Sequence, residues 1–260
     1  MAGRSIWGTG RDDVWAVGAG GSIAHWDGSS LRARESPVDV DLAAVWGSGS
    51  HDVWAVGQGG TILRFDGTSW RSFASPATNN LTGVSGSGPT DVWIFGENDF
   101  WHWNGSTWTA SSTTLGAPIL ALGVASPTDA WAMDLGSFIH RWNGSTWNQI
   151  PADPTAYLSV ASGLSATDIW AVGQAGAVAH FDGSTWSPVK VDTSENLTGV
   201  WERAPTDVWA VGGTTILHFD GARWSSTQLR AAVTLRSIWG SGPNEVWTGG
   251  ESGVLLRYAP

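Results

Sequence analysis

Short apolar runs alternate with glycine-rich breaks along the whole chain, and one run recurs seven times. It reads Asp-Val-Trp-Ala-Val-Gly or a close variant, and the acidic first residues of successive copies lie 38 or 39 residues apart. The copies begin at Asp13, Asp52, Asp91, Asp129, Asp168, Asp207 and Glu245. A period near 40 residues with strand-like content in every unit indicates a repeat array.

The second unit shows how one repeat is built. Residues 42–47 alternate small and large apolar side chains, and residues 52–57 form a short run bounded by glycine, which is typical of a strand buried on both faces. Residues 61–65 and the more polar residues 68–73 predict two further strands, joined by Asp66-Gly67. An Asp-Gly pair favours a hairpin with a type I′ turn, in which both central residues have positive φ. Four short antiparallel strands in each unit predict one blade of a β-propeller.

The repeats leave no room for a second domain, so we predict an all-β fold with one domain, 1–260, shaped as a seven-bladed β-propeller. The approximate repeats are 3–41, 42–80, 81–118, 119–157, 158–196, 197–234 and 235–260. The last repeat ends directly after its third strand. We therefore expect blade seven to lack its outer strand, unless upstream residues of a longer chain close it. An unpaired edge at 254–258 would favour edge-to-edge association.

Trp is unusually abundant, with 20 residues in register with the repeat. The most regular Trp is the third residue of each apolar run. Because every unit keeps it, we expect this series to fill the gaps between neighbouring blades rather than to contact a ligand. Its members are Trp15, Trp54, Trp93, Trp131, Trp170, Trp209 and Trp247.

The charge and the absence of Cys exclude several kinds of partner and site. The formal net charge is −10 at pH 7, and such a surface repels phosphate groups, which argues against nucleic acid and against anionic membranes. A chain without Cys has no disulfides and no thiolate metal site, and its His residues never stand at metal-ligand spacing. No Ser, His and Asp residues form a catalytic triad with the Ser at a nucleophile elbow, the sharp strand-to-helix turn of hydrolases. We therefore expect no catalytic residue, no metal and no cofactor.

A basic residue stands two positions before the Asx-Gly pair of each of the six repeats that contain this pair. The seven residues, here called the basic series, are His25, Arg64, His102, Arg141, His180, His218 and, by alignment, Arg257. In one interpretation each pairs with the acidic residue that begins strand two of its own or a neighbouring blade. In the other, each presents hydrogen-bond donors to a ligand in the groove between blades. The first interpretation is favoured, and one residue could serve both roles.

One position breaks the symmetry of the repeats. Six residues before the acidic residue, four blades that are adjacent in a closed ring carry Trp, whereas the other three carry Ser85, Gly123 and Ser162. The four residues, here called the aromatic arc, are Trp7, Trp46, Trp201 and Trp239. Because first strands lie innermost in a propeller, we expect the arc to border the central channel. Aromatic platforms beside small polar residues suit sugar rings, but these Trp could equally be packing that fills the channel.

The repeat also resembles those of known propeller families. The unit Gly-Pro-Thr-Asp-Val-Trp, followed by Ile-Leu-His-Phe and Asp-Gly-Ser-Thr-Trp, resembles the repeats of seven-bladed bacterial propeller lectins, which implies the same fold and sugar binding. A second likeness is to propellers of the Asp-box and photosystem-assembly-factor type. Their box has one residue between Asp and Gly, whereas Asp182-Gly183 has none.

These features favour a non-enzymatic, lectin-like propeller that binds glycans weakly at several sites, through the aromatic arc and the basic series. The alternative is a protein-protein interaction scaffold of a larger bacterial protein, and a wide exposed apolar patch would favour it. A glycosidase-like enzyme is the least favoured class. For the location, we favour the cell surface or the outside of a bacterial cell.

Overall fold

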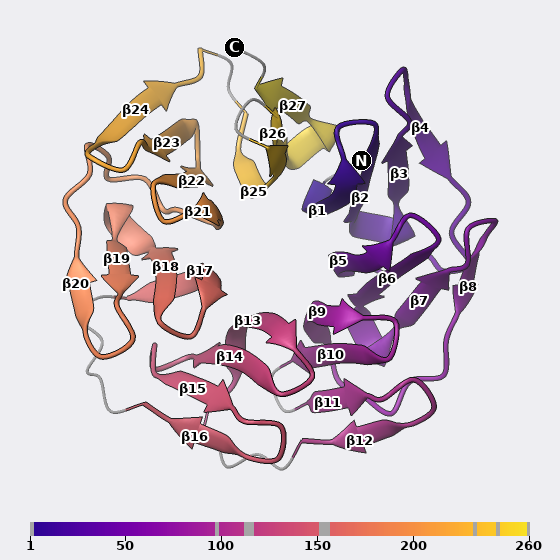
Figure 1. Ribbon diagram of the computed structural model, residues 1–260. Helices are drawn as coiled ribbons and strands as arrows, with labels where there is room; N and C mark the ends of the chain where they lie inside the picture. The colour runs from indigo at the N-terminus through magenta and orange to yellow at the C-terminus, as the bar shows by residue number, and fades with distance from the viewer. Residues whose placement is uncertain are drawn as a thin grey trace.

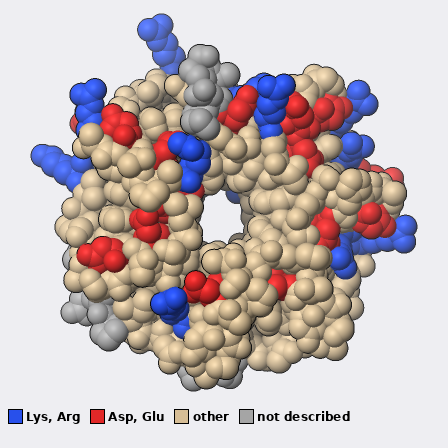
Figure 2. Space-filling view, in the orientation of Figure 1, with Lys and Arg blue, Asp and Glu red and all other residues tan. Residues whose placement is uncertain are grey.

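The strands of the protein form seven sheets around a central channel. The computed structural model describes residues 3–96, 99–111, 117–150, 157–230, 233–242 and 245–258. Figure 1 shows the sheets arranged as a ring, and Figure 2 shows the channel open at its centre. Each sheet is one blade, and blades one to seven follow one another in chain order. The predicted all-β, seven-bladed architecture is confirmed.

Strands of three to eight residues build the blades. Blade one contains β1 (Gly3–Gly10), β2 (Asp13–Gly18), β3 (Ile23–Trp26) and β4 (Leu31–Arg34); blade two β5 (Leu42–Gly49), β6 (Asp52–Gly57), β7 (Ile62–Phe65) and β8 (Trp70–Ser72); blade three β9 (Leu81–Gly88), β10 (Asp91–Gly96), β11 (Phe100–Trp103) and β12 (Trp108–Ala110); blade four β13 (Ile119–Ser126), β14 (Asp129–Asp134), β15 (Ile139–Trp142) and β16 (Trp147–Gln149). Blade five contains β17 (Leu158–Ser165), β18 (Asp168–Gly173), β19 (Val178–Phe181) and β20 (Trp186–Pro188); blade six β21 (Gly199–Ala204), β22 (Asp207–Gly212), β23 (Thr215–Phe219) and β24 (Trp224–Gln228); blade seven β25 (Leu235–Gly242), β26 (Glu245–Gly250) and β27 (Leu255–Tyr258). Within the described ranges, short 3₁₀ turns follow the second strand in four blades: η1 (Ala19–Gly21), η2 (Gln58–Gly60), η3 (Gln174–Gly176) and η4 (Glu251–Gly253).

Within each blade the strands are antiparallel and follow chain order from the channel outward. Each first strand packs against the first strand of the next blade, and β1 packs against β25, which closes the ring. Among the described residues, blade seven has three strands, so its third strand β27 is its outer edge. The expected incomplete last blade is therefore confirmed.

The core lies between the blades. Both faces of each second strand are covered by neighbouring sheets, which is why this strand reads as a nearly continuous apolar run. Seven hydrophobic clusters result, one at each junction between two blades. The strand-two Trp series is at most 5% exposed. The prediction that this series belongs to the core is confirmed.

The Asx-Gly pairs lie in the hairpins between third and fourth strands, but the turn differs from the predicted one. In blade four a four-residue loop, 143–146, joins β15 to β16, and only Gly144 in it has positive φ, at 93°. The Asn143 side chain accepts hydrogen bonds from the amides of Ser145 and Thr146 at 3.0 and 2.9 Å. The prediction of a type I′ turn is therefore wrong, because the Asx side chain satisfies the amides of a longer loop.

Candidate functional site

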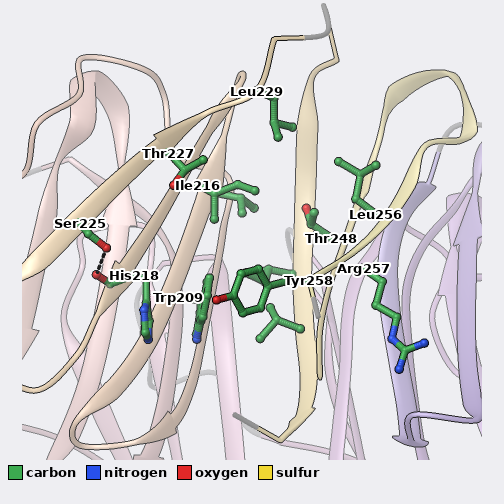
Figure 3. A pocket seen from close by; sticks show the side chains of 13 residues that line it. Trp209, Ile216, His218, Ser225, Thr227, Leu229, Thr248, Leu256, Arg257 and Tyr258 are labelled. Atoms are coloured by element: carbon green, nitrogen blue, oxygen red, sulfur yellow. Dashed lines mark hydrogen bonds between the residues drawn. The ribbon is translucent and has the colours of Figure 1, made fainter. Parts of the chain in front are cut away.

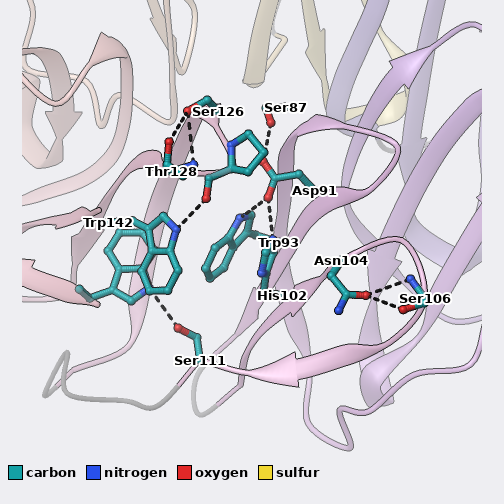
Figure 4. A network of polar contacts seen from close by, with 12 residues as sticks. Ser87, Asp91, Trp93, His102, Asn104, Ser106, Ser111, Ser126, Thr128 and Trp142 are labelled. Atoms are coloured by element: carbon teal, nitrogen blue, oxygen red, sulfur yellow. Dashed lines mark hydrogen bonds and ion pairs between the residues drawn. The ribbon is translucent and has the colours of Figure 1, made fainter. Parts of the chain in front are cut away.

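Each blade holds its member of the basic series against the acidic residue that begins its second strand. In blade three, His102 Nε2 lies 2.6 Å from Asp91 Oδ1, and the Trp93 indole donates to the same carboxylate at 3.1 Å (Figure 4). Ser87 donates to its other oxygen. The same pairing, within one blade and never between two, recurs as His25–Asp13, Arg64–Asp52, Arg141–Asp129, His180–Asp168, His218–Asp207 and Arg257–Glu245.

The strand register places the basic side chain on the strand-two Trp as well. His102 lies opposite Trp93 in the ladder, and the two rings stack with centroids 4.1 Å apart. In blade two the Arg64 guanidinium lies 4.7 Å from the centroid of the Trp54 ring. Burial alone would raise the pKa of Asp91, but hydrogen bonds, led by the one from His102, outweigh it and lower this pKa. The basic series therefore has a structural role, and its contact with a ligand stays a prediction.

The aromatic arc lies on the inner strands and reaches from each blade to the next. A Cβ at Gly47 of blade two would lie 2.5 Å from the six-membered ring of Trp7 in blade one. A side chain at this position would overlap the ring, and it would also lie too close to the carbonyl oxygen of Asp52 in the same blade, at 2.8 Å. The corresponding Cβ positions lie 2.7 Å from Trp46 at Gly86, closer still to Trp201 at Gly240 and 3.0 Å from Trp239 at Gly8. All four Trp residues are half-buried.

This packing explains why the arc is contiguous. Each Trp of the arc is matched by a glycine in the next blade. Of the three blades that follow a blade without this Trp, two carry a larger residue in place of the glycine. Blade four carries Val124 after Ser85 of blade three, and blade six carries Glu202 after Ser162 of blade five. At Gly123 of blade four, the strand-two Trp131 turns into the free space instead. Packing between blades therefore accounts for the arc, and sugar binding by it stays a prediction.

Glu202 is an acidic side chain buried between blades five and six. It is 4% exposed, and its amide donates to Ser162 Oγ of blade five at 3.1 Å. Its carboxyl group lies near the carboxylate of Asp168 and the backbone of Leu164 in blade five. Burial, and after it the negative charge of Asp168, raises the pKa of Glu202 to about 8. At neutral pH this carboxyl group is therefore mostly protonated.

An apolar groove of about 390 Å³ opens between blades six and seven (Figure 3). Its volume falls within the range of about 300–1,000 Å³ that is usual for binding pockets. Blade six contributes its second, third and fourth strands, and blade seven contributes all three of its strands. The apolar part of the lining includes Trp209, Ile216, Leu229, Leu256 and Tyr258, and Thr227 lines it from β24.

The groove lies where other blades place their fourth strand. In blades two, three, four and six, the first Trp of the fourth strand packs against the strand-two Trp of the preceding blade. Their ring centroids are 5.3–6.0 Å apart, in the pairs Trp15–Trp70, Trp54–Trp108, Trp93–Trp147 and Trp170–Trp224. Trp209 of blade six keeps only the contact that the other strand-two Trp residues also make with the third strand of the next blade, here with Tyr258 at 5.1 Å. Since the described part of blade seven has no fourth strand, the space beside Trp209 stays open.

The eleven predicted site residues do not form one site. The aromatic arc lies on first strands and the basic series on third strands, so the second strand of each blade separates them. Only His218 and Arg257 of these residues line the groove. The sequence indicated the unpaired edge at 254–258. It held no sign that Leu229 and Ile216 of blade six face the same space.

Two other classes of site find no support in the described residues. Within them, no group of three or more His, Asp or Glu side chains is placed to hold a metal ion. No helix in this part of the chain is both long and apolar enough to cross a membrane.

Comparison with known proteins supports the fold. No family model matches the chain, and no curated protein sequence does. Among solved structures, the chain is similar over its whole length to YCF48 from Cyanidioschyzon merolae, with a TM-score of 0.79, 20% identity and 95% of that chain covered. It is also similar to YCF48 bound to D1 peptide (0.81, 19%, 93% of that chain) and to the WD40 β-propeller domain of Doa1 (0.79, 11%, 93% of that chain). At these identities the likeness establishes a seven-bladed propeller fold and nothing finer, and these three structures add no support to the lectin resemblance.

Proposed function

We propose that this protein is a non-enzymatic protein-interaction propeller that binds an extended segment of a partner protein between blades six and seven. The observation that carries the proposal is the apolar groove beside β27, whose outer edge pairs with no other strand in the described part of the chain. Of the two main functions that the sequence suggests, the groove favours the interaction scaffold over the lectin.

The edge of blade seven differs in chemistry from those of the other blades. Fourth strands form the outer edges elsewhere, and beyond their first residue they are mostly exposed and polar, as in β8 (Trp-Arg-Ser) and β16 (Trp-Asn-Gln). The exposed edge of blade seven is instead the third strand β27, Leu-Leu-Arg-Tyr, in which Tyr258 is 47% exposed. An apolar edge with unpaired backbone groups is a template for another strand. Strand addition at such an edge is a common mode of peptide recognition.

One similar structure gives independent support, since it is described as YCF48 bound to D1 peptide. That peptide is a ligand of YCF48, and for this chain it supports only the class of a protein partner. Sugar binding by the aromatic arc has less support, because each Trp of the arc already covers a glycine of the next blade. His218 and Arg257 are the predicted site residues that a segment in the groove would contact.

A parallel screen against peptides and glycans tests the proposal. The purified protein is used to select from a peptide display library, and the same preparation is applied to a glycan array. Thr227→Trp fills the groove from an exposed position of β24, and Ser226→Trp is its matched control because neighbouring residues of a strand point to opposite faces. We expect peptides that bind the parent and the control but are lost with Thr227→Trp. Glycans that bind while no peptide is selected would contradict the proposal.

A further inference from the structure

We propose that the partner segment is a β-strand with a Trp-x-x-apolar pattern, which completes blade seven by pairing with the outer edge of β27. This inference rests on the proposed function and specifies its ligand. The occupant is a strand of another protein, and its chemistry follows from the fourth strands that this chain already contains.

The register of the other blades defines where the Trp of the partner would lie. Five fourth strands begin with a Trp that pairs with the last aromatic residue of the third strand: Phe65–Trp70, Trp103–Trp108, Trp142–Trp147, Phe181–Trp186 and Phe219–Trp224. Tyr258 is the corresponding residue of blade seven. A Trp opposite Tyr258 would stand beside Trp209, as Trp224 stands beside Trp170 with ring centroids 5.4 Å apart. This is the space that the groove leaves open.

A repeated backbone hydrogen bond defines the pairing of the main chain. In blade four, the amide of Ile150 donates to the carbonyl of Ile139 at 2.8 Å. The same bond joins Phe73 to Ile62, Ser111 to Phe100 and Val189 to Val178, at 2.8–2.9 Å. Leu255 holds the position of Ile139 in blade seven, and the described residues include no fourth strand to donate to it. A partner strand would supply this donor three residues after its Trp.

The residue that carries this amide is also the apolar residue of the pattern. Phe73, Ile150 and Val189 each lie three residues after a fourth-strand Trp and pack on the opposite side of their blade, toward the next one. A small pocket beside Leu255 lies on the corresponding side of blade seven, between it and blade one. Ile6, Ala24 and Leu31 line this pocket. One strand with Trp and an apolar residue three positions later would therefore fill both spaces.

A peptide with the sequence of this chain's own fourth strand is the direct probe. The capped octapeptide Asn-Gly-Ser-Thr-Trp-Asn-Gln-Ile, residues 143–150, carries a fluorophore at its N-terminus, and its anisotropy is followed as the protein is added. A second peptide has Ser for the Trp, and a third has an N-methyl group on the final Ile. We expect each of the two changes to weaken binding at least tenfold. Thr227→Trp in the protein should weaken it equally, and Ser226→Trp should leave it within twofold of the parent.

A fusion of the peptide to the protein makes the pairing measurable even if the free octapeptide binds weakly. The octapeptide is joined to the C-terminus through a flexible Gly-Ser linker, which makes pairing with β27 intramolecular and raises its effective concentration. The fusion should unfold at a higher temperature than a fusion that carries Ser for Trp. Absence of peptide binding together with equal unfolding temperatures would overturn the inference. So would binding that survives both peptide changes.

Failure of this inference is distinguishable from failure of the proposed function. Display peptides that need the groove but lack the Trp-x-x-apolar pattern would contradict the strand and leave the interaction function intact. No selected peptide at all would contradict both. A dimer in sedimentation that Thr227→Trp abolishes and the octapeptide fails to dissociate would assign the groove to a second copy, which also overturns the inference.

Discussion

The buried carboxyl group of Glu202 should make the stability of the protein fall as the pH rises. The perturbation is Glu202→Gln, which keeps the size of the side chain and removes the titration. The pKa of Glu202 is raised from its ordinary value of 4.5 to about 8, first by burial and then by the charge of Asp168. Below pH 4.5 the group is protonated in the folded and the unfolded chain alike. Between 4.5 and about 8 only the folded chain keeps the proton, so the free energy of unfolding decreases with pH until it levels off above 8.

The magnitude follows from the displacement of the pKa. One pH unit corresponds to about 1.4 kcal/mol, so the penalty at pH 9 reaches about 5 kcal/mol relative to pH 4. Between pH 5 and pH 7.5 the parent should lose on average about 1.2 kcal/mol of stability per pH unit relative to Glu202→Gln. The difference in slope is the informative quantity, because the amide of Gln adds a constant contribution of its own. A penalty of this size is a large part of the free energy of unfolding of a typical domain, which is about 5–15 kcal/mol.

Urea unfolding followed by Trp fluorescence measures this slope at half-unit steps from pH 5 to pH 9. Glu35→Gln, at an exposed position, is the control for the loss of one glutamate. We expect the free energies of unfolding of the parent and Glu202→Gln to diverge with pH, and those of the parent and Glu35→Gln to stay parallel. A difference between the parent and Glu202→Gln that changes by less than about 0.5 kcal/mol over this range would refute the reasoning. The carboxyl group would then ionise near its ordinary pKa, with water reaching it.

Three further predictions concern the packing of the blades. Gly47→Ala places a methyl group against a Trp ring of the preceding blade and should cost about 1–3 kcal/mol by overpacking, whereas Gly49→Ala, with nothing within 4 Å, should cost less than about 0.5 kcal/mol in urea unfolding. Trp170→Ala should cost about 3–5 kcal/mol through the cavity it leaves, and a variant that melts like the parent would show that this Trp is no core residue. Replacing Trp46 and Trp239 together by Ser should lower the unfolding temperature, because each ring covers a glycine of the next blade. If the parent binds a glycan on the array, that binding should fall at least tenfold in the double variant. Unchanged glycan binding would show that the arc serves only packing between blades.

The sequence alone determined the architecture, because the signals that specify it are local. A strand needs its apolar period, a hairpin needs Asx and Gly at defined positions, and both are visible within a few residues. Counting the copies then predicts seven blades. The turn type was predicted wrongly because Asn143 and its equivalents cap backbone amides with their side chains, which a dipeptide signal does not reveal.

The site depended on contacts between blades, which repeat patterns do not contain. Trp7 meets Gly47, and Ser162 meets Glu202, across 40 residues of sequence. Such contacts depend on the angle between neighbouring sheets and on the register of their inner strands. The aromatic arc, a Trp position that only four of the seven blades keep, could therefore indicate either a ligand platform or packing between blades. The contacts of these Trp rings with glycines of the next blade favour packing.

The basic series and the groove also combine features visible in the sequence with contacts that only the tertiary structure determines. The sequence placed a base and an acid in every blade, and the tertiary structure decided that each pair forms within one blade, with the base stacked on Trp in blades such as the third. The sequence also indicated an unpaired edge at 254–258, but an edge alone is not a binding site. The groove exists because Trp209 and Leu229 of blade six face a space that a fourth strand would otherwise fill. That space is a property of two blades packed together, so no single repeat could predict it.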